Sequence, residues 1–222
     1  MRTILKLLVL ACFVATAFTA AYADGVNAYV LVWNAPLPGQ QQATLAALPS
    51  GNPNWAFDYT GPINFVNNNP NGGSNTFQDF FGANAAGIWN ISPSDLNALL
   101  GSTMSLPGEG NLQTYMEFIF ELNVPAPGFS GTVYHDDGAS LYNCGALSYC
   151  SPIFESGAWT GDTGNPFTMP GGDNVYDLVY VEANGSPSIL QMDTPTVPEP
   201  ASLLLLGTGL LGLAGIGRKY VR

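Results

Sequence analysis

Hydrophobic and polar residues alternate most regularly over residues 115–124, YMEFIFELNV. On an extended chain, one face carries Met116, Phe118, Phe120, Leu122 and Val124, and the other carries Glu117, Glu121 and Asn123. A period of two is typical of a strand with one buried and one solvated face. We therefore expect a half-buried strand here, with Glu117 and Glu121 in water.

Shorter apolar segments predict further strands at residues 28–33, 56–59, 63–66, 132–135, 176–183 and 188–192. Asn184 and Gly185 separate the last two segments, and both residue types tolerate the positive φ of a tight turn. These two strands are therefore expected to pair as a hairpin. The segment SPSDLNALLG predicts one short helix, with Ser92 as N-cap and Pro93 as its first residue.

The composition favours many short strands joined by turns, because 26 Gly and 17 Pro accompany only 9% charged residues. Residues 24–196 are enough for one domain with a substantial core. The sequence therefore predicts an all-β fold. It consists of a β-sandwich or jelly-roll-like body with one short helix, between an N-terminal signal peptide and a C-terminal single transmembrane sorting helix.

The two ends of the chain differ from the body, because they hold all five Lys and Arg residues. At the N-terminus, Arg2 and Lys6 precede an apolar run, and the small-residue segment AYA follows it at residues 21–23. This order predicts a secretory signal peptide over residues 1–23.

The C-terminal tail, residues 197–222, has an apolar run at residues 201–217 and a basic cluster at residues 218–222. At about 1.5 Å per residue, the run falls just short of a hydrocarbon thickness of about 30 Å. Basic residues after the run indicate a cytoplasmic end, with the body outside. The pattern fits a transmembrane helix, including one that is kept as a permanent anchor.

A short motif, Pro198-Glu199-Pro200, stands immediately before this apolar run, and Arg218-Lys219 follows it. The three-part tail resembles the PEP-CTERM sorting signal of Gram-negative bacteria. The resemblance implies an intermediate held transiently in the inner membrane, from which an exosortase-type transpeptidase removes the tail. It also implies release of the body to the cell surface or the extracellular exopolysaccharide.

The body is strongly acidic, because all 16 Asp and Glu residues lie between Asp24 and Glu199, with no Lys or Arg among them. Such a body repels the phosphate backbone of a nucleic acid. No Gly-rich strand-to-helix loop is present to hold a phosphorylated cofactor. With one His, the only route to hydrolysis is a pair of carboxylates facing a cleft, and no pair stands out.

Cys144 and Cys150 are the only cysteines of the body, in a chain that is expected to be exported. Exported proteins form disulfides, so this pair is expected to be oxidised. A metal or catalytic role is disfavoured, because His135 is the only imidazole in the sequence.

Asp136 and Asp137 stand side by side in the segment HDDG, at the end of a predicted strand. With no cationic side chain in the body, each raises the pKa of the other unless a cation lies between them. Carboxylates suit Ca²⁺, which also accepts Asn side chains, backbone carbonyls and water. The alternative is an Asp-Asp-Gly turn with two solvated carboxylates, and the sequence leaves both open.

The segments HDDGASLYNCG and YDLVYVEANGSPSILQMD are similar to the strand-loop-strand and final hairpin of the protective-antigen-type lectin-like β-sandwich. Bacterial toxins, glycosidase inserts and yeast flocculins share this domain. The resemblance covers residues 115–193 and implies a Ca²⁺ site at Asp136 and Asp137, where in adhesin members the ion contacts sugar hydroxyls. His135 and Cys144 depart from the family's usual Ser and Asp, and residues 24–110 match no pattern.

Two aromatic residues near the cysteine loop, Tyr149 and Trp159, are candidates for stacking on sugar rings. We therefore expect a non-catalytic protein of the cell surface or exopolysaccharide, either a calcium-stabilised glycan-binding protein or a matrix and biofilm protein. Two alternatives remain open: a secreted polysaccharide hydrolase that uses a carboxylate pair, and a structural matrix filler with no specific ligand.

Overall fold

The computed structural model describes residues 25–36, 42–67, 75–107, 111–145, 150–158 and 160–195. These residues belong to one compact unit, Gly25–Pro195. The predicted signal peptide, the sorting tail, Tyr149 and Trp159 lie outside the described residues.

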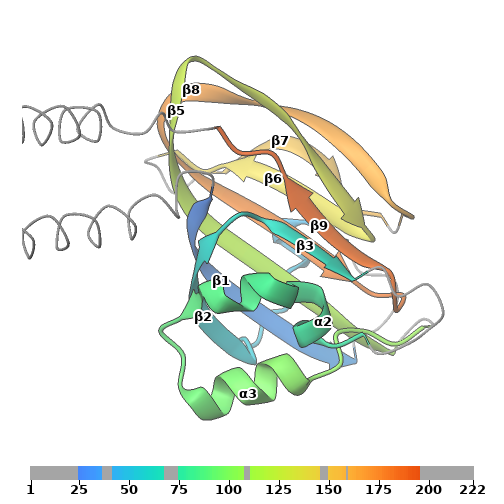
Figure 1. The fold of residues 1–222 in the computed structure, drawn as a ribbon. Coiled ribbons are helices and arrows are strands. Elements are labelled where there is room, and N and C mark those ends of the chain that lie inside the picture. Colours follow the sequence, from blue (N-terminus) through green and yellow to red (C-terminus); the bar gives the residue numbers. More distant parts are fainter. Residues whose placement is uncertain are drawn as a thin grey trace, which may run out of the picture. The chain divides into compact units, whose positions relative to one another are not determined.

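The body is built mainly of antiparallel strands (Figure 1). The strands are β1 (Val26–Pro36), β2 (Trp55–Gly61), β3 (Asn64–Asn67), β4 (Ile88–Trp89), β5 (Leu112–Asp136), β6 (Gly138–Asn143), β7 (Ser151–Ser156), β8 (Thr163–Glu182) and β9 (Ser188–Met192). The helices are η2 (Leu45–Ala47), α2 (Phe77–Phe81), η3 (Gly82–Gly87) and α3 (Pro93–Gly101). The predicted all-β class is confirmed.

Two long strands, β5 and β8, connect the two layers of the sandwich. The larger layer has the strand order β4-β2-β1-β5-β8-β6-β7. The pairing of β5 with β8 shifts register between Val124 and Gly128, and the second halves of both strands belong to the other layer. In that layer β9 pairs with β5, and β3 pairs with β9. Figure 1 shows this long hairpin arching over β3 and β9.

The core between the layers is rich in aromatic residues. The ring of Phe65 on β3 lies 5.0–5.9 Å, centre to centre, from the rings of Tyr59, Phe80, Phe81 and Phe118. Aromatic side chains bury about 150–250 Å² each, so this cluster contributes much of the hydrophobic stabilisation. It joins β2, β3, β5 and α2.

Sequence reasoning predicted most of these elements but missed α2 and the strands β4 and β7, and it divided β5 into two separate strands. The predicted helix is present as α3, and the Ser92 side chain accepts the N–H of Asp95 as an N-cap. The shorter helix α2 has five residues, too few to show a helical period. Its available sequence signal is the capping box in which Thr76 and Asp79 bond each other's backbone N–H.

The predicted hairpin at Asn184 and Gly185 is wrong. Strand β9 pairs with β3 and β5, not with β8. The connecting segment instead crosses from one layer to the other, and the N–H of Gly185, which has a φ of +86°, donates to the hydroxyl of Ser105. Turn-forming residues indicate a reversal of the chain, but they do not determine which strand follows as a partner.

A second apolar cluster covers part of the outer face of the larger layer, formed by Trp33, Ala43, Tyr115, Tyr142, Val179, Val181 and Ala183. Leu45 and Leu48 from the η2 segment pack against it, together with Cys144 and Cys150. The predicted disulfide between these cysteines is present, with an S–S distance of 2.10 Å.

The expectation that Glu117 is solvated is wrong. Glu117 on β5 is 8% exposed, and Asp177 beside it on β8 is 6% exposed, whereas Glu121 is exposed as predicted. Burial and the neighbouring Glu117 raise the pKa of Asp177 to about 8. Burial also raises the pKa of Glu117. At neutral pH the pair therefore shares a proton, which Asp177 donates to Glu117.

Because the unfolded chain releases the Asp177 proton near pH 4 and the folded protein keeps it to about pH 8, stability falls as pH rises through this window. Asp177→Asn supplies a neutral donor at every pH. We expect it to flatten part of this slope and to raise the free energy of unfolding at pH 8 by about 1 kcal/mol or more. Urea denaturation over a pH series measures this, with the exposed Asp173→Asn on the same strand as control. An Asp177→Asn protein that is less stable than the wild type at pH 8 contradicts the shared proton.

Candidate functional site

Asp136 and Asp137 lie where β5 passes directly into β6, and the peptide bond between them is cis. Asp136 is 9% exposed and Asp137 is 3% exposed. The two carboxyl groups are therefore not on a solvated turn, although both residues line a cavity.

The cavity has a volume of about 260 Å³ and an open mouth. Three segments that are distant in the sequence line it: the β5–β6 junction, the loop before β8, and the crossing from β8 to β9. The lining residues are Asp136, Asp137, Thr160, Gly161, Asn184, Gly185, Ser186 and Pro187. The segment misread as a hairpin turn therefore forms one wall of the site.

Backbone and side-chain hydrogen bonds fix Asp137. Its Oδ2 accepts the N–H of Ala183 at 2.7 Å, and its carbonyl accepts the hydroxyl of Thr160 at 2.7 Å. The same carbonyl lies 2.9 Å from Nδ1 of His135. A carbonyl can only accept, so Nδ1 carries the proton, and Nε2 is free to accept from Asn165 at 3.3 Å.

The imidazole of His135 supports the loop and does not face the cavity as a ligand. It is fully buried, and burial lowers its pKa. The ring is therefore neutral, and it stabilises the aspartate pair through its hydrogen bond to the carbonyl of Asp137. These hydrogen bonds explain the large side chain of His135 at a position where the protective-antigen-type family usually has Ser.

A third carboxyl group, Glu182, lies behind the pair and is fully buried. The hydroxyl of Tyr180 lies 2.5 Å from the carbonyl oxygen of Asp136 and 2.9 Å from Oε2 of Glu182. The Tyr180 hydroxyl donates to both oxygens, so its proton is shared in a three-centre hydrogen bond that joins Glu182 to the aspartate pair.

The surroundings of Glu182 disfavour its ionised form. Burial and the charge of Asp137 raise the pKa of Glu182 well above its ordinary value. Its other oxygen accepts the hydroxyl of Ser105 at 2.7 Å, and Ser105 accepts from Asn75 at 2.9 Å. A buried polar network thus connects the site to the chain before α2.

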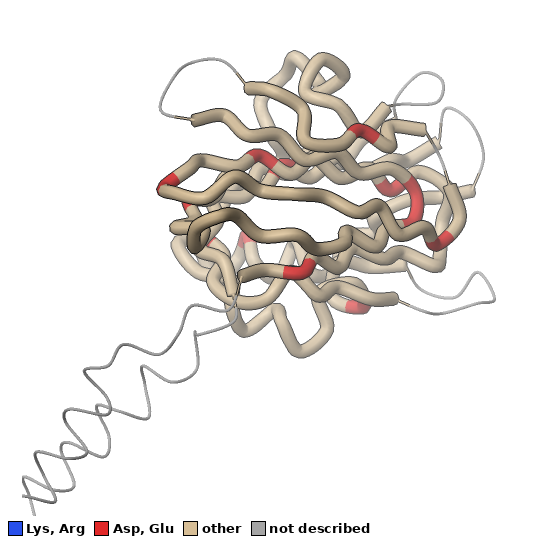
Figure 2. Tube along the Cα trace, turned by 90° about the horizontal axis from the view of Figure 1, so that it is seen from above, with Lys and Arg blue, Asp and Glu red and all other residues tan. Residues whose placement is uncertain are grey.

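The electrostatics of the cavity favour a cation. Burial, then the charges of Asp137 and Asp162, raise the pKa of Asp136 to about 7. Burial raises the pKa of Asp137 to about 6, less than it would without the N–H groups of Ala183 and Asn184. Along the described trace, Figure 2 shows acidic positions and no Lys or Arg. A cation bound from solution would therefore favour the ionised form of both carboxyl groups.

The donor set around the cavity fits a hard cation. Among the described residues, no group of three or more His, Cys, Asp and Glu side chains could hold a metal ion. Two carboxylates, the amide oxygen of Asn184, the hydroxyl of Thr160 and nearby carbonyls are instead all oxygen donors, as Ca²⁺ prefers. Sequence reasoning identified the two aspartates but missed Asn184 and Thr160, because nothing local marks them as neighbours of residues 23–48 positions away.

Comparisons with known proteins agree with both parts of the chain. Residues 196–219 match the PEP-CTERM protein-sorting motif. Among the described residues, no helix is long and apolar enough to cross a membrane. No curated protein shows a significant sequence match to the chain.

Two solved structures share the fold of the body. A PA14 sugar-binding domain from an RTX adhesin has a TM-score of 0.53 at 14% identity, over 75% of this chain and 88% of that one. The PA14 domain of the MpAFP antifreeze protein has a TM-score of 0.51 at 12% identity, over 74% of this chain and 79% of that one. The chain therefore combines a PA14-like, lectin-like β-sandwich with a C-terminal PEP-CTERM motif, which indicates export through a membrane-anchored sorting intermediate.

Proposed function

We propose that this protein is an exported, non-catalytic surface protein whose body binds glycans through a Ca²⁺ ion held by Asp136 and Asp137. The observation that carries the proposal is the buried carboxylate pair, which faces a 260 Å³ cavity in a body without Lys or Arg. A cation would stabilise the ionised pair, and the cavity leaves room beside it for part of a sugar.

The residues that would hold the ion are Asp136, Asp137 and Asn184. Bound there, Ca²⁺ would neutralise the carboxylates and offer its remaining positions to sugar hydroxyls and water, since it takes about 6–8 oxygen ligands. Burial and the charge of Asp137 raise the pKa of Glu182 and favour its neutral form, so the local charge stays close to that of the two aspartates, which a divalent ion balances. The hydroxyl of Thr160 is fixed by the carbonyl of Asp137, so it supports the loop.

The sorting motif supports the proposed location. Exosortase processing near Pro198 would release the body from the inner membrane of a Gram-negative cell to its surface or exopolysaccharide. The fold match to a sugar-binding domain from an adhesin supports the ligand class. Catalysis is not part of the proposal, because the single imidazole is buried and neutral.

The first test is calcium-dependent stability. Ca²⁺ bound only to the folded state stabilises it by roughly 2.7 kcal/mol when free ion is about a hundred times its dissociation constant. We expect the melting temperature to rise with Ca²⁺ beyond the response to Na⁺ at matched ionic strength. Asp136→Asn/Asp137→Asn should abolish the increment.

A matched control separates a site from general screening. Glu121→Gln/Asp173→Asn removes the same number of charges from exposed positions and should keep the full calcium increment. An increment that survives in Asp136→Asn/Asp137→Asn would show that the pair is not a calcium site.

Glycan binding is tested by retention on host exopolysaccharide. We expect retention to require Ca²⁺, to be lost on chelation, and to fall about tenfold or more in Asn184→Ala, an exposed position where truncation leaves the core intact. Polysaccharide chain length should not change during incubation. Shortened chains would indicate a hydrolase, and absence of retention with intact calcium binding would indicate a matrix filler.

Sorting is tested by the intact mass of the protein recovered from the host surface. We expect it to lack both residues 1–23 and the tail beyond about Pro198. A surface species that still contains GIGRKYVR would show that the tail is a permanent anchor.

A further inference from the structure

Two exposed aromatic rings lie on either side of one carboxylate on the outer face of the larger layer. Four large hydrophobic side chains are exposed among the described residues: Tyr29, Trp89, Leu106 and Tyr134. Asp58 on β2 pairs with Tyr29 on β1 and with Trp89 on β4, so all three side chains share one face. The strands that carry the two rings, β1 and β4, lie two strand spacings apart, about 10 Å, which is close to the length of two linked hexose rings.

Hydrogen bonds hold this arrangement in place. Nε1 of Trp89 donates to the hydroxyl of Thr60 at 3.2 Å, and that hydroxyl donates to Asn27 at 2.8 Å. The side-chain amide of Asn90 donates to Oδ2 of Asp58 at 2.8 Å. Trp89, which is 55% exposed, is therefore oriented on the sheet and is not a free side chain.

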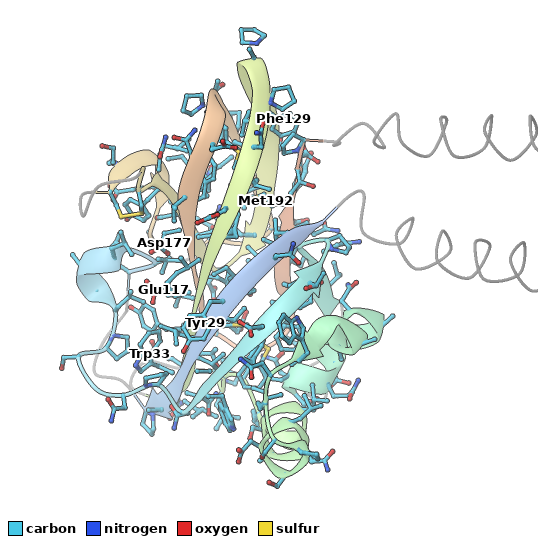
Figure 3. All side chains as sticks on the ribbon, turned by 90° about the vertical axis from the view of Figure 1, so that its left-hand side faces the viewer. Tyr29, Trp33, Glu117, Phe129, Asp177 and Met192 are labelled. Carbon is cyan, nitrogen blue, oxygen red and sulfur yellow. A yellow bond between two sulfur atoms is a disulfide. The ribbon has the colours of Figure 1, made fainter. Side chains whose placement is uncertain are left out.

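The charge of this face selects among the partners that an aromatic platform could take. Tyr29 lies opposite Ile119, which lies opposite Asp177, and Glu117 and Glu121 flank Ile119 on the same face. Figure 3 shows Tyr29, Glu117 and Asp177 on neighbouring strands. Glu117 and Asp177 are buried and share a proton, so the charge of this face comes from the exposed Glu121 and the half-buried Asp58, which are both acidic. A second copy of the chain would therefore be repelled, whereas a partner with amino groups is attracted.

We propose that a polysaccharide with free amino groups binds across the outer face of β1, β2 and β4. Its sugar rings stack on Tyr29 and Trp89, and an ammonium group between them pairs with Asp58. Flat faces of sugars pack on aromatic rings, and a cation beside the ring adds a favourable electrostatic contact. This site shares no residue with the calcium cavity and does not depend on the function proposed there.

The test measures binding of a glucosamine hexamer to the purified exported protein by calorimetry, at mildly acidic pH where the sugar amine is charged. We expect Tyr29→Ala, Trp89→Ala and Asp58→Asn each to weaken binding about tenfold. The control is Tyr134→Ala, which removes a ring of similar exposure from the second half of β5 and should bind as the wild type. Trp89→Phe keeps an aromatic ring and should retain most of the affinity.

Two further comparisons separate this site from the cavity. Chelation of Ca²⁺ and Asp136→Asn/Asp137→Asn should leave hexamer binding unchanged, so the two proposals fail independently. The N-acetylated hexamer, with the same rings and no charge, should bind at least tenfold more weakly. Equal binding of both hexamers, or wild-type binding by Tyr29→Ala, Trp89→Ala and Asp58→Asn, would overturn the proposal.

Discussion

Burial of carboxyl groups without a cationic side chain is the constraint on which both halves of this body depend. Five acidic residues are buried among the described residues: Glu117, Asp136, Asp137, Asp177 and Glu182. An unpaired buried charge is costly, so each group must keep a proton or take a cation from solution. Glu117 and Asp177 share a proton, and burial raises the pKa of Glu182, which favours its neutral form. Asp136 and Asp137 face a cavity that an ion can enter.

The long β5–β8 hairpin places these groups. Both strands run through the two layers. On β8, Asp177 lies on the outer face and Glu182 lies in the interior, five residues further along the strand. Odd spacing places side chains on opposite faces of a strand, so the sequence VYDLVYVE gives one carboxyl group to each face. Tyr180 points inward with Glu182 and connects it to the aspartate pair.

The sequence predicted what local patterns encode. Periodicity located the first half of β5, and short apolar segments located the end of β5, the second half of β8 and β9. The cap at Ser92 located α3, and Asp136-Asp137 identified the acidic part of the cavity. The pairing of β9 and the burial of Glu117 were mispredicted, because each depends on residues brought close only by folding. From the sequence alone Glu117 is expected to be solvated, because the pattern does not show that Asp177 lies beside it. Asn184 is likewise expected in a hairpin turn, because the sequence does not show that Ser105 accepts the N–H of Gly185.

Two proposed sites in one small body would change what the protein does in a matrix. A single weak glycan site only coats a polymer, whereas two sites that share no residue can engage two chains or two parts of one chain. The second contact then forms at an effective concentration set by the rigid sandwich, so that overall affinity exceeds that of either site. The two ligand classes differ in charge, because the cavity requires Ca²⁺ and hydroxyl groups and the aromatic face requires amines. Calcium would therefore control the contact at the cavity, and pH would control the contact at the aromatic face. A body of this kind would crosslink a matrix that contains both ligand classes more strongly than a matrix that contains one.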